Sequence, residues 1–162
     1  FVTPVIILAH PINSFVEDFV GKDRTLKRLN LFTAKDAINS DADFFSENDN
    51  IVEAVSLMKD KQLKSVFVLN DQSEPTGRLV LKDLNMRENV QGSCKNYAIE
   101  LKSKIDINES LKNISSKMYL HTKSSFACVN ENGRYIGEIS QESISAFLNL
   151  AYSEAKTGFE DE

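Results

Sequence analysis

The sequence predicts an α/β fold of the α+β type. Two strand–helix–strand–strand–helix (βαββα) repeats are expected to pack as one pseudo-symmetric module, preceded by a helical linker. Residues 43–84 and 103–144 align at an offset of 60 without a gap. Both copies also change from helical to strand-like patterning in the same order. The 162 residues, 41% of them hydrophobic, are enough for a substantial core. Because neither copy could bury its sheet well alone, we expect the two to pack face to face.

The repeat rests on a few identities with parallel chemistry between them. The identical residues at the offset of 60 are Asn48 and Asn108, Met58 and Met118, Ser65 and Ser125, Asn70 and Asn130, and Gly77 and Gly137. Self-similarity at a fixed spacing indicates a duplicated structural unit.

Each copy contains a pattern for one amphipathic helix. Residues 46–49 and 106–109 place a short polar residue three positions before an acid, which predicts a helix start there. Apolar residues then follow at spacings of three, four and seven, which puts them on one helix face. They are Ile51, Ala54, Val55 and Met58 in the first copy, and Leu111, Ile114 and Met118 in the second.

Two strands and a second helix follow in each copy. The short apolar runs 66–69 and 126–129 are typical of buried strands. Turn-forming residues occupy 70–75 and 130–133. A second strand then begins at Gly77 and at Gly137, and a second helix is expected near Lys82 and near Glu142.

Composition excludes several function classes. The net charge of −5 argues against electrostatic capture of a nucleic acid polymer. The longest apolar stretch, 5–9, is far shorter than the roughly 20 residues of a membrane-spanning helix. The two cysteines, Cys94 and Cys128, lack metal-site spacing and fit a reducing cytosolic compartment. No P-loop, metal-ligand set or nucleophile–base arrangement is visible. We therefore expect no catalysis, no metal and no required cofactor.

The paired blocks carry a family resemblance. The stretches VFVLNDQSEPTGRLVLKDL (66–84) and FACVNENGRYIGEISQESI (126–144) resemble a tandem pair of CBS domains, and the resemblance covers roughly 36–150. It implies one disc-like module of two repeats. It also implies clefts that often bind adenosine-containing ligands, and dimerisation through the modules.

The first thirty residues carry a second resemblance. The stretch TPVIILAHPINSFVEDFVGKDRTLKRLN (3–30) is similar to the end of the ATPase domain in osmoprotectant ABC transporters, which take up glycine betaine, carnitine or choline. In such subunits the CBS pair is a regulatory tail. In some relatives it is bound by cyclic di-AMP, and in others it is linked to sensing ionic strength. The chain opens at Phe1 rather than Met, and we expect it to be a piece of a longer protein.

The resemblance implies candidate ligand contacts. Nucleotide-binding CBS repeats often carry a hydroxyl at the end of the glycine-containing strand and an Asp three residues later. Here the pattern is split between Val80 with Asp83 and Ser140 with Ser143. Aromatic or apolar faces for two purines would come from other strand positions. The predicted ligand-binding residues are Phe44, Val66, Val80, Asp83, Phe126, Ile139, Ser140 and Gln141.

Structural roles compete with these assignments. Asp83 could serve the positive end of a helix dipole, and Ser140 could be an N-cap. Val80 and Phe126 could be ordinary core residues, and so could at least one of Phe44 and Phe45.

The resemblance also implies organisation and partners. We expect the end of an ATPase domain and a linker at 1–35, CBS repeats at 36–92 and 93–150, and an acidic tail at 151–162. The expected partners are a second copy, a small nucleotide with cyclic di-AMP favoured over AMP or ATP, and permease subunits reached through the ATPase domain. The expected location is cytoplasmic, at the inner face of the cell membrane. An ionic-strength sensor is one alternative, in which the basic residues Lys22, Arg24, Lys27, Arg28 and Lys35 meet the acidic tail. A ligand-free dimerisation module is the other.

Overall fold

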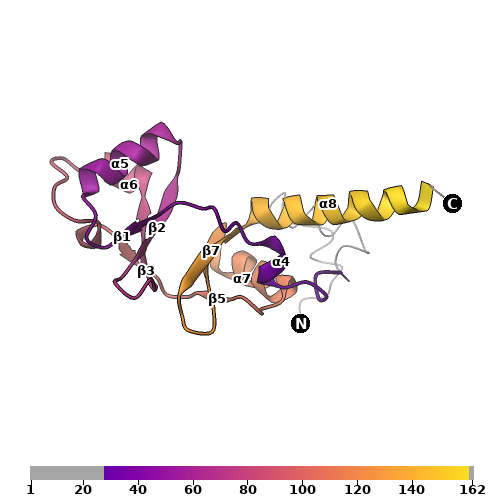
Figure 1. Cartoon of the computed structure of the whole chain (residues 1–162). Helices are drawn as coiled ribbons and strands as arrows, with labels where there is room; N and C mark the ends of the chain where they lie inside the picture. Colours follow the sequence, from indigo (N-terminus) through magenta and orange to yellow (C-terminus); the bar gives the residue numbers. More distant parts are fainter. Residues whose placement is uncertain (1–27, 161–162) are drawn as a thin grey trace. The chain divides into compact units, whose positions relative to one another are not determined.

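The computed structural model describes residues 28–160, with side chains through residue 150 (Figure 1). The stretch similar to ATPase domains therefore falls almost wholly outside the described residues. So do Lys22, Arg24, Lys27 and the acidic residues 161–162. Within the described part no helix is long and apolar enough to cross a membrane.

The described chain forms two compact units that interleave along the sequence. The first-repeat unit comprises Ser40–Lys104 and Ala127–Gly137, and the second-repeat unit comprises residues 28–39, Ile105–Phe126 and Glu138 onward. The linear domain boundaries expected from the sequence stay a prediction.

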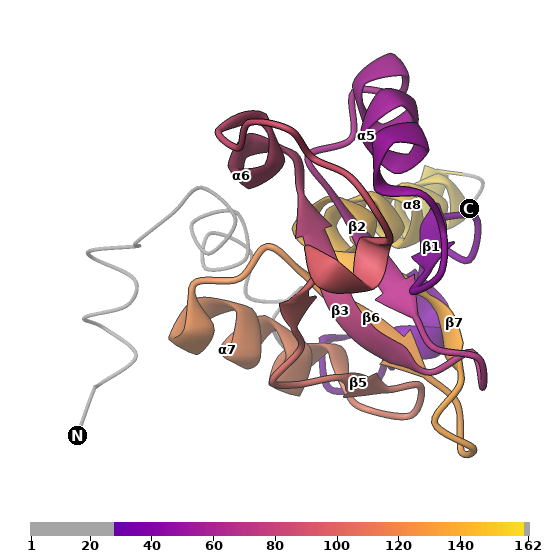
Figure 2. The ribbon, with the colours of Figure 1, turned by 90° about the vertical axis from the view of Figure 1, so that its left-hand side faces the viewer.

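The first-repeat unit is built on a four-stranded sheet in the order β1-β2-β3-β4. Its elements are β1 (Phe44–Ser46), α5 (Ile51–Asp60), β2 (Ser65–Leu69), β3 (Pro75–Val80), α6 (Leu81–Asn85), the short 3-10 helix η1 (Cys94–Asn96) and β4 (Ile99–Glu100). Strand β1 runs parallel to β2, and the β2–β3 and β3–β4 pairs are antiparallel. Helices α5 and α6 lie beside this sheet (Figure 2).

The core of this unit lies between the helices and the sheet. Ile51, Ala54 and Met58 of α5 pack with Val66 and Val68 of β2, Leu79 of β3 and Leu84 of α6. The helix positions are the stripe expected from the sequence, and their spacing puts them on one face. The opposite face of the sheet carries the alternate residues of each strand.

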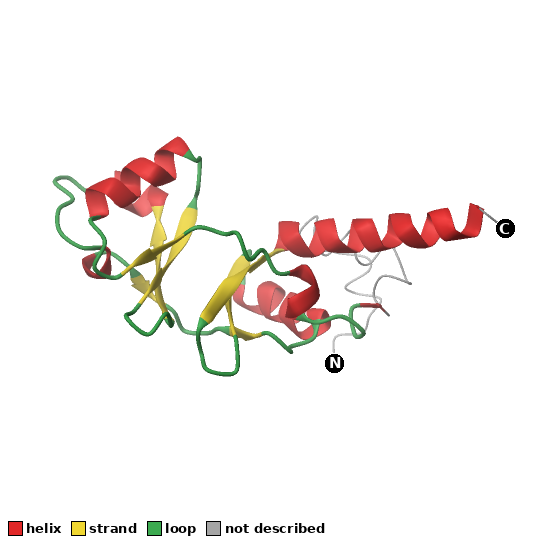
Figure 3. Ribbon diagram, viewed as in Figure 1, coloured by secondary structure: helices red, strands yellow, loops and turns green. Residues whose placement is uncertain are grey.

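The second-repeat unit repeats the strand–helix–strand–strand–helix order of the first, with a short helix added from an earlier segment. Its elements are α4 (Ala34–Ala37), which comes from the segment before the first repeat, then β5 (Ile105–Asp106), α7 (Leu111–His121), β6 (Ser125–Val129), β7 (Tyr135–Ser140) and α8 (Gln141–Glu160). Strands β5, β6 and β7 form a three-stranded sheet in that order. Figure 3 shows the strand and helix types of both copies.

Backbone details confirm the offset of 60. Left-handed backbone occurs at Gln62 and Ser73 in the first copy and at Thr122 and Gly133 in the second. Asn70 and Asn130 each use the side-chain oxygen to accept two backbone N–H groups of the following turn. Strands β2 and β6 start 60 residues apart, as do β3 and β7. The sequence prediction of two βαββα repeats is therefore confirmed.

The predicted helix starts are wrong by several residues. The N-caps are Asn50 and Ser110, whose side chains accept backbone N–H groups of α5 and α7. The polar segments 46–49 and 106–109 instead form the turns before the helices, with Asp49 accepting from the Ser46 N–H at 2.8 Å. An acid three residues after a short polar residue serves a turn as readily as a helix.

Each unit is completed by a segment that precedes the other repeat. Residues 33–39 belong to the second-repeat unit, where the Ala34 N–H donates to the Glu109 carbonyl and the Leu111 N–H donates to the Phe32 carbonyl. Residues 93–100 belong to the first-repeat unit, where the Cys94 N–H donates to the Asp49 carbonyl and the Ile51 N–H to the Gly92 carbonyl. The two sets of bonds are related by the same offset of 60.

Candidate functional site

The eight sequence-predicted ligand residues divide evenly between the two units. Phe44, Val66, Val80 and Asp83 lie in the first-repeat unit, and Phe126, Ile139, Ser140 and Gln141 in the second-repeat unit.

In the first-repeat unit, the sheet separates Val66 from Phe44 and Val80. Phe44 is opposite Phe67 in the register, and Val80 is opposite Ser65. Because residues alternate along β2, Phe44 and Val80 share one sheet face and Val66 lies on the other. Val66 is 2% exposed and belongs to the helix-side core, whereas Phe44 is 55% exposed. Phe44 is thus the accessible aromatic surface of this set.

Val80 and Asp83 sit at the junction of β3 and α6. Val80 is the N-cap residue of α6 and provides no side-chain cap. Asp83 is exposed in the first turn of this helix. A carboxylate at this point suits the helix dipole and also remains accessible to the hydroxyl groups of a sugar.

The structure adds three residues to this site that were not among the predicted ligand residues: Phe67, Arg78 and Tyr135. The guanidinium of Arg78 lies 4.7 Å from the ring centroid of Phe67. Tyr135, from the hairpin of the second repeat, packs edge-on against Phe44 at 5.7 Å and tilted against Phe67 at 6.0 Å. We name Phe44, Phe67, Arg78 and Tyr135 the aromatic–arginine cluster.

The register explains why this cluster forms. Phe44, Phe67, Arg78 and Ile99 are directly opposite one another across β1 to β4 and form one row on the sheet face away from the helices. The equivalent positions in the second copy are Lys104, Ala127 and Glu138. An accessible ring beside a guanidinium is a combination that can stack a planar base and hold an anion. The second copy lacks this combination.

In the second-repeat unit, the predicted apolar residues are core. Phe126 is 4% exposed and Ile139 is fully buried. Ser140 and Gln141 are half-buried at the junction of β7 and α8. Ser140 and Ser143 bond reciprocally, each hydroxyl oxygen accepting the other residue's backbone N–H at 2.9–3.0 Å. The Ser140 hydroxyl therefore acts at the start of α8, as an N-cap would.

The Cys94 thiol and the possible metal ligands of the described residues are candidate reactive or binding groups. Burial, together with the negative charge of Asp49, raises the pKa of the Cys94 thiol to about 11. A thiol with so high a pKa carries little thiolate at neutral pH. Among the described residues, no group of three or more His, Cys, Asp and Glu side chains could hold a metal ion.

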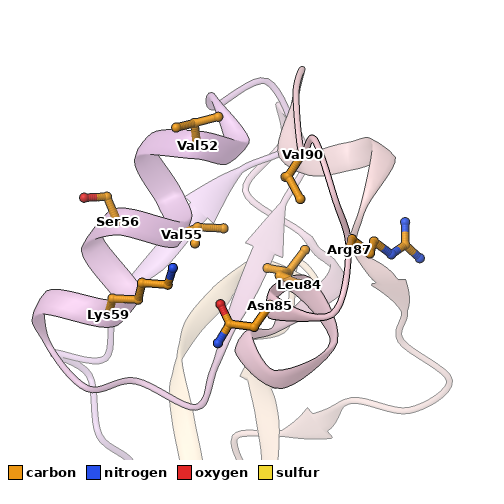
Figure 4. A pocket seen from close by; sticks show the side chains of 8 residues that line it. All are labelled: Val52, Val55, Ser56, Lys59, Leu84, Asn85, Arg87 and Val90. Carbon is orange, nitrogen blue, oxygen red and sulfur yellow. The ribbon is translucent and has the colours of Figure 1, made fainter.

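A concave feature lies on the helix side of the first-repeat unit. A groove of about 410 Å³ opens between α5 and α6 (Figure 4). Val52, Val55, Leu84 and Val90 provide its apolar surface, and Ser56, Lys59, Asn85 and Arg87 its polar rim. No sequence pattern indicates this groove, because the residues that form it come from two helices and a loop.

Comparison with known proteins identifies the family. The CBS domain model matches residues 34–88. The osmoprotectant import ATP-binding protein OsmV of Salmonella typhimurium (strain LT2) is 31% identical over 148 residues, or 91% of this chain. The chain is a CBS-domain pair. It is related to the C-terminal region of osmoprotectant ABC transporter ATP-binding subunits.

Two further similarities agree with this assignment. The carnitine transport ATP-binding protein OpuCA of Listeria monocytogenes (strain 10403S) is 31% identical over 90 residues, or 54% of this chain. A solved structure of the CBS domain of a bacterial CNNM/CorC family Mg²⁺ transporter, in complex with ATP, has a TM-score of 0.67. It is 12% identical and covers 76% of this chain and 91% of its own. This likeness shows the fold.

The CBS pair spans only part of its relatives. It covers 38% of the length of OsmV and 23% of the length of the Listeria protein. The family model matches a CBS domain in this chain, whereas both relatives are named as ATP-binding transport proteins.

Proposed function

We propose that the CBS pair is the regulatory region of the ATP-binding subunit of an osmoprotectant importer, and that an adenine nucleotide binds it to control transport. Similarity to OsmV along 91% of the chain carries the transporter assignment. The parent subunit would hydrolyse ATP, contact permease subunits through its ATPase domain, and work at the inner face of the cell membrane. The transported compound would be glycine betaine, carnitine, choline or a related osmolyte.

The proposed ligand is cyclic di-AMP, with AMP and ATP as the competing candidates. A solved CBS neighbour holds ATP, which supports an adenine ligand as a class. A ligand with two purines needs two stacking surfaces and donors for two phosphates. Phe44 offers an accessible ring, Arg78 a guanidinium and Asp83 an exposed carboxylate. Within the same unit, buried Val66 would support the sheet from its helix side, and Val80 would lie next to Asp83 at the start of α6. The predicted residues Phe126, Ile139, Ser140 and Gln141 would form a separate candidate set in the second-repeat unit.

The proposed mechanism is a shift of population between two arrangements of a homodimer. A ligand that binds one arrangement more tightly biases the attached ATPase domains toward the matching state. The ratio of the ligand's affinities for the two arrangements sets how far their populations shift. A ligand that binds both arrangements equally leaves the populations unchanged.

Calorimetry tests the ligand directly. The full 162-residue chain is titrated with cyclic di-AMP, AMP and ATP, and we expect cyclic di-AMP to bind most tightly. Substitution Phe44→Ala should weaken binding roughly tenfold, because stacking of a base on an aromatic ring contributes about 1–3 kcal/mol. Val52→Ala is the matched control, since Val52 is 54% exposed but lies on α5. Absence of heat with all three nucleotides would reject the sensor function.

A ligand-free dimerisation module is the second candidate. It is favoured by the cap role of the Ser140 hydroxyl and by the burial of Phe126. This function predicts that light scattering shows a dimer and that no nucleotide raises its melting temperature. A ligand raises the melting temperature only if it binds the folded state.

A further inference from the structure

The groove between α5 and α6 differs from the aromatic–arginine cluster in chemistry and in position. It lies on the helix side of the sheet, and its lining contains no aromatic residue. Val55, Leu84 and Val90 also pack against the hydrophobic core, so one wall is held firmly in place. A volume of about 410 Å³ falls within the range of small-molecule pockets. Aliphatic walls without a ring favour an aliphatic ligand over a purine.

The polar groups of the groove are unevenly placed. Figure 4 shows Lys59 and Asn85 near one end, and Val52 and Val90 near the other. Lys59 lies seven residues after Val52 on α5, which corresponds to about 10 Å along the helix axis. The groove is therefore amphipathic along its length.

The charge of the lining has one sign. Lys59 and Arg87 are its two charged residues and both are cations, although the whole chain has a net charge of −5. Arg87 lies 5.4 Å over the Tyr97 ring, and Figure 4 shows its guanidinium directed away from Leu84. Lys59, beside the Asn85 amide, is thus the cation available to a ligand head group.

We propose that this groove binds a free aliphatic carboxylate, with the chain along Val52, Val55, Leu84 and Val90 and the carboxylate at Lys59 and Asn85. An ammonium and an amide N–H can both donate to one carboxylate. The groove length suits an unbranched chain of medium length. The site is independent of the proposed nucleotide function, since it uses none of the same residues.

NMR titration of the ¹⁵N-labelled chain tests the proposal. The probes are hexanoate, octanoate and decanoate below their micelle-forming concentrations, with decyltrimethylammonium as the charge-reversed control. We expect shift changes centred on α5 and α6, with affinity rising about fourfold per added methylene. The cationic probe should bind at least tenfold more weakly than decanoate. Equal affinity for both probes, or no dependence on chain length, would overturn the proposal.

Three variants locate the two ends of the ligand. Lys59→Gln should weaken decanoate binding about tenfold, because a hydrogen bond to a charged group is lost. Lys112→Gln, at an exposed lysine of α7, is the matched control and should leave the affinity unchanged. Val52→Asp should abolish binding by placing a charge at the apolar end, and its melting curve verifies folding.

Other occupants give different results. If Val52→Asp changes the molecular mass in light scattering but not decanoate affinity, a second copy covers the groove and the proposal is wrong. Binding to phosphatidylglycerol vesicles without binding of decanoate would indicate a membrane surface and would also overturn it.

Discussion

At the scale of single residues, Cys94 shows how packing sets chemistry. Its side chain is fully buried in the core of the first-repeat unit, and its backbone N–H donates to the Asp49 carbonyl at 2.9 Å. Burial is the largest cause of the raised thiol pKa, and the Asp49 charge adds to it. Both effects disfavour the thiolate in the folded protein.

The raised pKa predicts a loss of stability at alkaline pH. The thiol pKa is about 11 when folded and 9.0 in the reference state, so the folded protein holds this proton more tightly. The contribution is complete below pH 9.0 and is lost as pH rises toward about 11. Urea unfolding of the wild type and Cys94→Ala across this range should show their difference in unfolding free energy shrinking by about 2 kcal/mol. A constant difference would contradict the assigned environment.

Gly77 is a second residue fixed by its surroundings. A Cβ at this position would lie 2.7 Å from the Ala98 Cβ and 3.2 Å from the Ile99 carbonyl oxygen. Gly77→Ala should therefore lower the free energy of unfolding by about 1–3 kcal/mol through overpacking. Adding Ala98→Gly should recover part of this loss, which a double-mutant cycle measures. Additive losses in the double variant would show that the two sites do not clash.

At the scale of elements, the helix starts depend on one side chain each. The Asn50 side-chain oxygen accepts from the N–H groups of Val52 at 2.8 Å and Glu53 at 3.1 Å. Asn50→Ala should cost about 1 kcal/mol of stability in thermal or urea unfolding. Asn48→Ala is the control inside segment 46–49, where the sequence pattern predicted the helix start, and should change stability by less than about 0.5 kcal/mol. Equal losses of stability in Asn50→Ala and Asn48→Ala would contradict the assignment of Asn50 as the N-cap.

Long periodic elements could be predicted from the sequence, and short ones could not. The stripes of α5 and α7 emerged because three or four apolar residues recur at helical spacing. The turns of both hairpins were predicted from their turn-forming residues, 70–75 and 130–133. Segments 33–39 and 93–100 were missed because four-residue α4, three-residue η1 and two-residue β4 are too short to show a period. Backbone pairing with a distant repeat stabilises them instead.

Candidate site residues could be proposed from the sequence only where the CBS resemblance supplies a position for them. Phe44, Asp83 and Ser140 were proposed from their positions in the CBS resemblance; the structure shows Phe44 and Asp83 accessible, and their role in ligand binding stays a prediction. Arg78 and Tyr135 were missed for two reasons. Arg78 lies opposite Phe67 only because of the sheet register, and Tyr135 reaches Phe67 from a hairpin 57 residues after Arg78. A sequence pattern shows which face a residue occupies, but not which distant side chain it contacts.

At the scale of the whole molecule, the interleaved chain makes each repeat depend on a segment outside it. Leu29 and Ala34 are buried in the second-repeat unit, and Phe32 packs edge-on against Phe147 at 4.9 Å. Asn39 and Glu138 exchange two backbone hydrogen bonds at 2.8 and 3.0 Å. A chain that begins at residue 40 lacks all of these contacts. Burial of Leu29 alone is worth about 1.5–3 kcal/mol, a sizeable share of the stability of a typical domain.

Hydrogen exchange gives a matched test of this dependence. The Leu111 N–H donates to the Phe32 carbonyl, and the Ile51 N–H, its counterpart 60 residues earlier, donates to the Gly92 carbonyl. In a chain beginning at residue 40, compared with one beginning at residue 28, the Leu111 amide should exchange at least tenfold faster. Loss of its acceptor leaves that amide unprotected without requiring the second-repeat unit to unfold. The Ile51 amide keeps its acceptor and should change much less. Equal acceleration of both amides would show that the segment stabilises the chain only globally, not by completing the second-repeat unit.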